Sequence, residues 1–97
     1  MHVRIITAQI QHDRIDEASR LYREAFMPAA RQQHGFKGGW LLLDHHTGKG
    51  LAILLWETET DLKAAEANHL LQQQIAQVAQ TFVSTPVREV YEVSVQA

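Results

Sequence analysis

The chain has 97 residues, of which 45% are hydrophobic and 21% are charged, and its formal net charge is −2. This composition predicts one globular domain, and the absence of a basic stripe argues against nucleic acid or anionic lipid as a partner. The sequence has no cysteine, so disulfides, thiolate nucleophiles and cysteine-based metal sites are excluded. No apolar run approaches the ~20 residues that span a bilayer, and no signal-peptide core is visible, so we expect a cytoplasmic protein without membrane contact.

The first two predicted elements are a strand and an amphipathic helix. Residues 3–10 are rich in isoleucine and place apolar side chains on both faces, which predicts a strand. Asp13 is a candidate N-cap for the helix that follows. Pro28 removes a backbone hydrogen bond and should kink that helix. Its apolar stripe recurs at three- and four-residue steps and consists of Ile15, Ala18, Leu21, Tyr22, Ala25, Phe26 and Ala29.

A β-hairpin is predicted for residues 35–59. Two apolar runs, 40–43 and 51–56, flank a polar segment in which Thr47-Gly48 can form a two-residue turn. Both faces of this hairpin are apolar, with Trp40 on one and Trp56 on the other, so both faces must be covered. The turn predicts three cross-strand pairs: Leu43 with Ala52, Leu41 with Leu54, and Gly39 with Trp56.

The remaining residues predict a second helical region and a last strand. Thr58 begins a short helix as a capping residue, Asn68 restarts it, and Pro86 precedes a strand over residues 87–95. The order β-α-β-β-α-β predicts a ferredoxin-like α+β fold, a four-stranded antiparallel sheet with both helices on one face. The other face would leave several Leu and Ile side chains in water. We therefore expect a homodimer that packs sheet against sheet.

Several short segments carry a family resemblance. They are GFKGGW at 35–40, TGKGL at 47–51, WETE at 56–59 with DL at 61–62, and PAAR at 28–31. With these segments, residues 1–97 resemble a single domain of the antibiotic biosynthesis monooxygenase-like (ABM) family, in the dimeric α+β barrel superfamily. The resemblance implies two ferredoxin-like protomers whose sheets meet, each with a ligand cleft between its sheet and its helices. Members of the family include cofactor-free oxygenases of polycyclic phenols or quinols and haem-degrading enzymes.

The haem-degrading branch can be compared with this sequence directly. Those enzymes carry an Asn on the first strand, and a Trp and a His on the second helix. The matching helix positions hold Ala65 and Ile75, and residues 3–10 contain no Asn. Haem degradation is therefore not expected, although His69 on the same helix can in principle supply an axial ligand.

Cofactor-independent oxygenation of a small aromatic or quinol metabolite needs an apolar pocket and a few polar groups that stabilise the substrate anion. The candidate catalytic residues are His69, Tyr22 and Tyr91. The candidate substrate-binding residues are Trp40, Trp56, Phe26 and Phe82. Two alternatives stay open: the aromatic residues fill the core of a non-catalytic dimer that binds a small hydrophobic ligand or is structural, and His69 is a solvated helix-start residue.

The six histidines do not indicate a metal site. His45 and His46 are adjacent at a strand end and point to opposite faces, so they cannot share one ion. No histidine pair at helical metal-ligand spacing and no carboxylate facial triad is present. We therefore expect neither a metal nor another cofactor.

Overall fold

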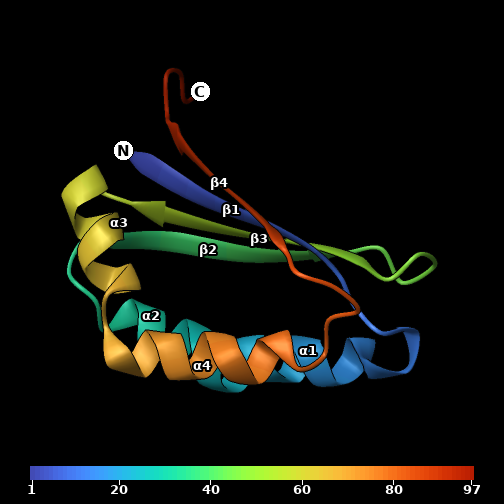
Figure 1. Cartoon of the computed structure of the whole chain (residues 1–97). Coiled ribbons are helices and arrows are strands. Elements are labelled where there is room, and N and C mark those ends of the chain that lie inside the picture. The colour runs from blue at the N-terminus through green and yellow to red at the C-terminus, as the bar shows by residue number, and fades with distance from the viewer.

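The chain folds into a four-stranded antiparallel sheet with all its helices on one face (Figure 1). The computed structural model describes residues 1–97. The strand order is β2-β3-β1-β4, which is the predicted ferredoxin-like α+β arrangement. The strands are β1 (His2–Gln9), β2 (Phe36–Leu43), β3 (Lys49–Trp56) and β4 (Val87–Glu92). β4 ends three residues earlier than predicted because its partner begins at His2, which lies opposite Glu92.

The first helical segment is broken by a π-helical turn. It consists of η1 (His12–Arg14), α1 (Ile15–Leu21), the π-helical η2 (Tyr22–Phe26) and α2 (Met27–Arg31). The helix is thus divided near Pro28, which occupies the first turn of α2 and needs no amide hydrogen there. The Asp13 prediction was wrong. Asp13 lies inside η1, and no side chain caps η1 or α1.

The second helical region begins twice, and both predicted caps are confirmed. Thr58 Oγ1 accepts a 3.0 Å hydrogen bond from the Asp61 amide at the start of α3 (Glu59–Glu66). Asn68 Oδ1 accepts a 3.2 Å hydrogen bond from the Leu71 amide at the start of α4 (His69–Ala79). None of the helices combines the length and the apolar character that crossing a membrane requires.

The hairpin loop is longer than the sequence suggested. Residues 44–48 form it, and Asp44 Oδ1 accepts hydrogen bonds from the amides of His46 at 2.9 Å and Thr47 at 3.2 Å. The predicted register was therefore wrong by two residues. A shift of two leaves every side chain on its predicted face because side chains alternate with period two. The observed pairs are Leu43 with Gly50, Leu41 with Ala52, and Gly39 with Leu54.

The two faces of the sheet differ sharply in exposure. Trp56 faces the helices and is 2% exposed, whereas Trp40 lies on the bare face and is 51% exposed. Phe36 lies opposite Trp56, with ring centroids 5.3 Å apart. The side chains of the bare face are mostly apolar, with Thr7 and Glu89 as polar residues among them and Gln9 and Lys49 at one end. The apolar side chains include the half-buried Val3, Ile5, Leu51, Ile53 and Leu55 and the exposed Trp40, Leu42, Val87 and Tyr91.

Candidate functional site

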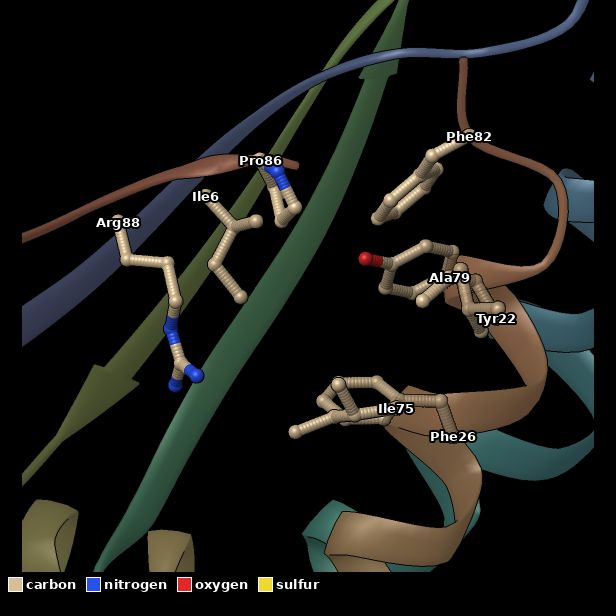
Figure 2. Close-up of a pocket in the computed structure, with 9 residues that line it drawn as sticks. Ile6, Tyr22, Phe26, Ile75, Ala79, Phe82, Pro86 and Arg88 are labelled. Atoms are coloured by element: carbon tan, nitrogen blue, oxygen red, sulfur yellow. The ribbon is translucent and has the colours of Figure 1, made fainter. Parts of the chain in front are cut away.

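A small apolar cavity of about 40 Å³ lies between the sheet and the helices (Figure 2). Ile6 of β1 and Arg88 of β4 form its sheet wall. The helical wall comes from η2 and α4 and from the residues that follow α4. The complete lining is Ile6, Tyr22, Phe26, Ile75, Val78, Ala79, Phe82, Pro86 and Arg88.

The π-helical turn supplies the aromatic side of the cavity. Tyr22 and Phe26 are both buried, and their rings meet edge to face with centroids 5.2 Å apart. Figure 2 shows the Tyr22 hydroxyl pointing across the cavity towards Ile6 and Pro86. Burial raises the pKa of Tyr22 to about 12, although the positive charge of Arg88 acts in the opposite direction. Tyr22 is therefore a neutral hydrogen-bond donor at neutral pH.

A charged cluster adjoins the apolar cavity. Both carboxylate oxygens of Glu66 on α3 accept hydrogen bonds from Arg4 of β1. Glu66 Oε2 also accepts a 3.1 Å hydrogen bond from Arg88 Nη2. The Arg4 side chain is only 14% exposed and the Arg88 side chain 43%. Two guanidinium groups and one carboxylate leave one positive charge in excess beside the cavity.

A second hollow, of about 20 Å³, connects this cluster with the core. Arg4, Glu66 and Arg88 all line it, together with Trp56. The residues that it shares with the larger cavity are Ile6, Phe26, Ile75 and Arg88. Arg88 therefore lies at the boundary between the aromatic cavity and the charged cluster.

The predicted site residues do not all come together. Tyr22, Phe26 and Phe82 line the larger cavity, and Trp56 lines the smaller one. Trp40 lies on the bare face of the sheet. Tyr91 lies there too, and its hydroxyl donates a 2.6 Å hydrogen bond to Glu89.

His69 is exposed at the first position of α4. Its Nε2 lies 3.1 Å from Nε2 of Gln73, one turn further along the same helix. The structure thus places His69 outside the lining of both hollows. No group of three His, Asp or Glu side chains is arranged as metal ligands in the chain.

Arg4, Glu66 and Arg88 were not among the residues selected from the sequence. One signal was available, because Arg4 alternates with Ile6 and Ala8 and so falls on the helix-facing side of an otherwise apolar strand. The pairing of Arg4 with Glu66 joins positions 62 residues apart, and local patterns do not reveal such a contact.

Phe82 and Pro86 lie between the cavity and an outer hollow. A cavity of about 40 Å³ accommodates water, whereas a benzene ring occupies cavities of roughly 150 Å³. An outer hollow of about 310 Å³ formed by residues 79 and 82–86 shares Ala79, Phe82 and Pro86 with the cavity. Rotation of the Phe82 ring would therefore join the two spaces.

Several solved structures with this arrangement of sheet and helices are described as antibiotic biosynthesis monooxygenases. A structure titled antibiotic biosynthesis monooxygenase superposes with a TM-score of 0.78 at 19% identity, covering 96% of this chain and 98% of that one. The chain has the fold of the antibiotic biosynthesis monooxygenases. The resemblance seen in the sequence is thereby confirmed for the fold.

Two Streptomyces oxygenases share this fold. SnoaB of Streptomyces nogalater, a cofactor-independent oxygenase, matches with a TM-score of 0.81 at 14% identity, covering 98% of this chain and 95% of its own. The monooxygenase from the gene ActVA-Orf6 of Streptomyces coelicolor, solved with the ligand nanaomycin D, matches with a TM-score of 0.85 at 11% identity. That match covers 99% of this chain and 89% of the Streptomyces coelicolor chain.

Two curated proteins are more similar in sequence. MT2634 and Rv2557, uncharacterized proteins from two strains of Mycobacterium tuberculosis, are each 32% identical to this chain over 98 aligned positions. The alignment covers 97% of this chain but only 41% of each relative, so the chain spans about two fifths of their length. No protein-family model matches the sequence.

Proposed function

We propose that the chain is a cofactor-independent monooxygenase of the ABM type that oxidises a small phenol or quinol in the cleft between sheet and helices. The observation that carries this proposal is an aromatic cavity that presents one phenol hydroxyl, from Tyr22, and one guanidinium, from Arg88. An apolar pocket with a few convergent polar groups is the usual form of a small-molecule site. The cofactor-independent oxygenase SnoaB shares the fold, which supports the same reaction class.

The two polar groups suit a substrate whose reactive form is an anion. A guanidinium a few ångströms from a phenol favours its ionised form and lowers its pKa. The Tyr22 hydroxyl, kept neutral by a pKa of about 12, donates a hydrogen bond to the same oxygen. The phenolate is electron-rich and reacts with dioxygen at a ring carbon, while the apolar walls exclude water.

The reaction balances without an external reductant. A phenol with a hydrogen on the ring carbon opposite its hydroxyl reacts with one dioxygen to give a quinone and one water. One oxygen atom forms the new carbonyl on that carbon. The other leaves as water with the hydrogen of that carbon and the phenol proton. A quinol, whose opposite carbon already carries a hydroxyl, reacts in the same way at a ring carbon that bears a hydrogen and gives a hydroxyquinone and one water. The ring supplies all four electrons that reduce dioxygen, so no flavin, haem or metal is needed.

We also propose that the protein is a homodimer that packs its two bare sheet faces together. That face exposes Trp40, Leu42, Val87 and Tyr91 and half-buries five further aliphatic side chains. Burying apolar surface contributes about 25 cal/mol per Å². Leaving this face in water would forfeit several kcal/mol, a large share of the ~5–15 kcal/mol that stabilises a typical domain. A second copy offers a surface of the same chemistry and curvature.

One observation favours a non-catalytic function instead. Tyr22, Phe26 and Phe82 crowd the aromatic cavity, whose volume is only about 40 Å³. In this alternative the cleft is a side-chain core, or it binds a small apolar ligand without reaction. The monooxygenase proposal requires the Phe82 ring to move outward when substrate binds.

Oxygen uptake with a panel of naphthols and quinols distinguishes these functions. We expect the wild-type chain to consume dioxygen in proportion to the quinone that forms. Arg88→Met removes the charge at nearly constant length and should lower the rate about tenfold or more, the usual effect of losing one charged hydrogen bond. Arg20→Met removes an exposed guanidinium that lines neither this cavity nor any hollow that Tyr22 lines, and it should leave the rate unchanged. Binding of these compounds without oxygen uptake would contradict the oxygenase and support the ligand-binding alternative.

A further inference from the structure

The two arginines of the charged cluster are close neighbours on the same face of the sheet. The β1–β4 register pairs Ile6 with Arg88 and Arg4 with Val90, so Arg4 and Arg88 are diagonal neighbours on the helix-facing side. Diagonal neighbours on adjacent strands lie within reach of long side chains. Two guanidinium groups there repel each other, and the Arg4 side chain is mostly out of water. Without a compensating charge, Arg88 would turn towards solvent.

Glu66 supplies that compensating charge from a third element. Its carboxylate is held by two hydrogen bonds from Arg4, and its Oε2 also accepts from Arg88 Nη2. Arg88 makes a single ion pair in the chain, and its partner is Glu66. The backbone next to this carboxylate is fixed as well, because Gln72 Nε2 donates a 3.0 Å hydrogen bond to the Glu66 carbonyl. Glu66 therefore joins α3 to β1 and β4 at the edge of the cavity.

We propose that Glu66 is a positioning residue: held by Arg4, it keeps the Arg88 guanidinium at the wall of the cleft, facing the ligand. The inference rests on the proposed function, because that function makes Arg88 the group that stabilises the ligand anion. Glu66 does not line the larger cavity and acts only through Arg88. Arg4, which has the least exposed side chain of the three, anchors the carboxylate rather than the ligand.

A purely electrostatic function for Glu66 predicts the opposite sign. If Arg88 stays in place without Glu66, removal of the carboxylate leaves two positive charges in excess and should make the cleft bind anions more tightly. If Glu66 positions Arg88, its removal releases the guanidinium and the cleft loses its preference for anions. Removal of Glu66 therefore strengthens anion binding in the first case and weakens it in the second.

The pKa of bound 4-nitrophenol measures how strongly the cleft prefers the anion. Its phenolate absorbs visible light, and its nitro group occupies the carbon where the proposed oxygenation occurs, so it binds without reacting. We expect the wild-type chain to lower the pKa of the bound phenol by about one unit, the smaller end of the effect of a neighbouring guanidinium. Arg88→Met and Glu66→Gln should both abolish the shift. Glu17→Gln removes the matched carboxylate of the Arg14–Glu17 pair outside the cavity and should leave the shift intact. A larger shift in Glu66→Gln than in the wild type would overturn the proposal.

A crystal structure of the Glu66→Gln chain tests the same inference without any ligand. We expect Arg88 to turn away from the cavity, and an Arg88 side chain in its original place would refute a positioning function. Should Glu66→Gln not fold, Glu66→Asp keeps the charge but is too short to reach both arginines, and it should show the same loss. If the pKa of bound 4-nitrophenol changes as expected in these variants but the wild type takes up no oxygen, the oxygenase is rejected and the positioning function of Glu66 is supported. Oxygen uptake at the same rate in the wild type and in Glu66→Gln would support the oxygenase and reject the positioning function of Glu66.

Discussion

Gly35 packs directly against the side chain of Asp61. Gly35 has a φ of +84°, and a Cβ on it would overlap the Asp61 carboxylate. The Oδ1 atom of Asp61 lies 2.8 Å from Nδ1 of His34. The backbone amide of Asp61 donates a hydrogen bond to Oγ1 of Thr58, the residue that caps α3. This corner fixes the start of α3 against the residues that lead into β2, and α3 carries Glu66.

The Gly35→Ala substitution should destabilise the protein. The positive φ alone costs about 1–3 kcal/mol for a residue with a Cβ, and the overlap with Asp61 adds to it. Urea unfolding measures the loss. Gly38→Ala is the matched control, because its Cβ would meet the Trp40 ring at an ordinary 3.4 Å and its φ is not positive. We expect that variant to stay within about 1 kcal/mol of the wild type, and equal effects of the two substitutions would contradict this account of Gly35.

Tyr22 should make stability depend on pH in the alkaline range. Its pKa is raised from 10 to about 12 by burial, so the unfolded chain loses this proton before the folded chain does. The contribution of the neutral phenol is therefore complete below pH 10 and lost as the pH rises towards 12, by about 2–3 kcal/mol. Tyr22→Phe should flatten this decline in urea unfolding measured across the range. Tyr91→Phe removes a phenol that lies on the other face of the sheet and is half exposed in the single chain, and the decline should persist in that variant.

Phe82→Ala should open the cavity to the outer hollow. The truncation removes a ring that packs against both hydrophobic clusters of the core, so the free energy of unfolding should fall by about 2–4 kcal/mol. Small aromatic compounds should bind more tightly to this variant in calorimetry. Val83→Ala, at an exposed neighbouring position, should change neither quantity. Unchanged aromatic binding in Phe82→Ala would argue against access past this ring.

Trp40→Glu should separate the proposed homodimer. Trp40 is half exposed in the single chain, so the charge is tolerated there but not between two packed apolar sheets. Sedimentation at micromolar concentration should show a dimer for the wild type and a monomer for the variant. Gln77→Glu, which adds the same charge on the exposed side of α4, should remain dimeric. A monomeric wild type would refute the sheet-to-sheet dimer.

Local patterns were sufficient for most of the fold. Thr58 and Asn68 cap helices where their side-chain chemistry predicted, and the face of each hairpin residue followed from its period-two alternation. The register failed because Asp44 folds the loop through its own side chain, a longer turn than the two residues that Gly48 suggested. The π-helical turn at Tyr22–Phe26 could not be read from the sequence, because its two buried residues, Tyr22 and Phe26, are four residues apart, which is also the spacing of an α-helical stripe.

The site was less predictable than the fold. Tyr22 and Phe26 could be selected because aromatic residues on a helix stripe face the sheet, and Phe82 because it continues the apolar stripe of α4 beyond the end of that helix. The alternation of the last strand already separated Tyr91 from Arg88, yet only the structure shows which of the two faces the helices. Glu66 carries no local signal at all, because its partners are contributed by both ends of the chain.

Isotopically labelled dioxygen tests monooxygenation by this chain most directly. The wild-type protein is incubated with a reactive phenol under heavy dioxygen in ordinary water, and the quinone is analysed at once by mass spectrometry. The proposed reaction predicts one heavy oxygen atom in each quinone, and Arg88→Met should form little labelled product. A quinone that carries no label from dioxygen, or labelled product formed equally well by Arg88→Met, would contradict it.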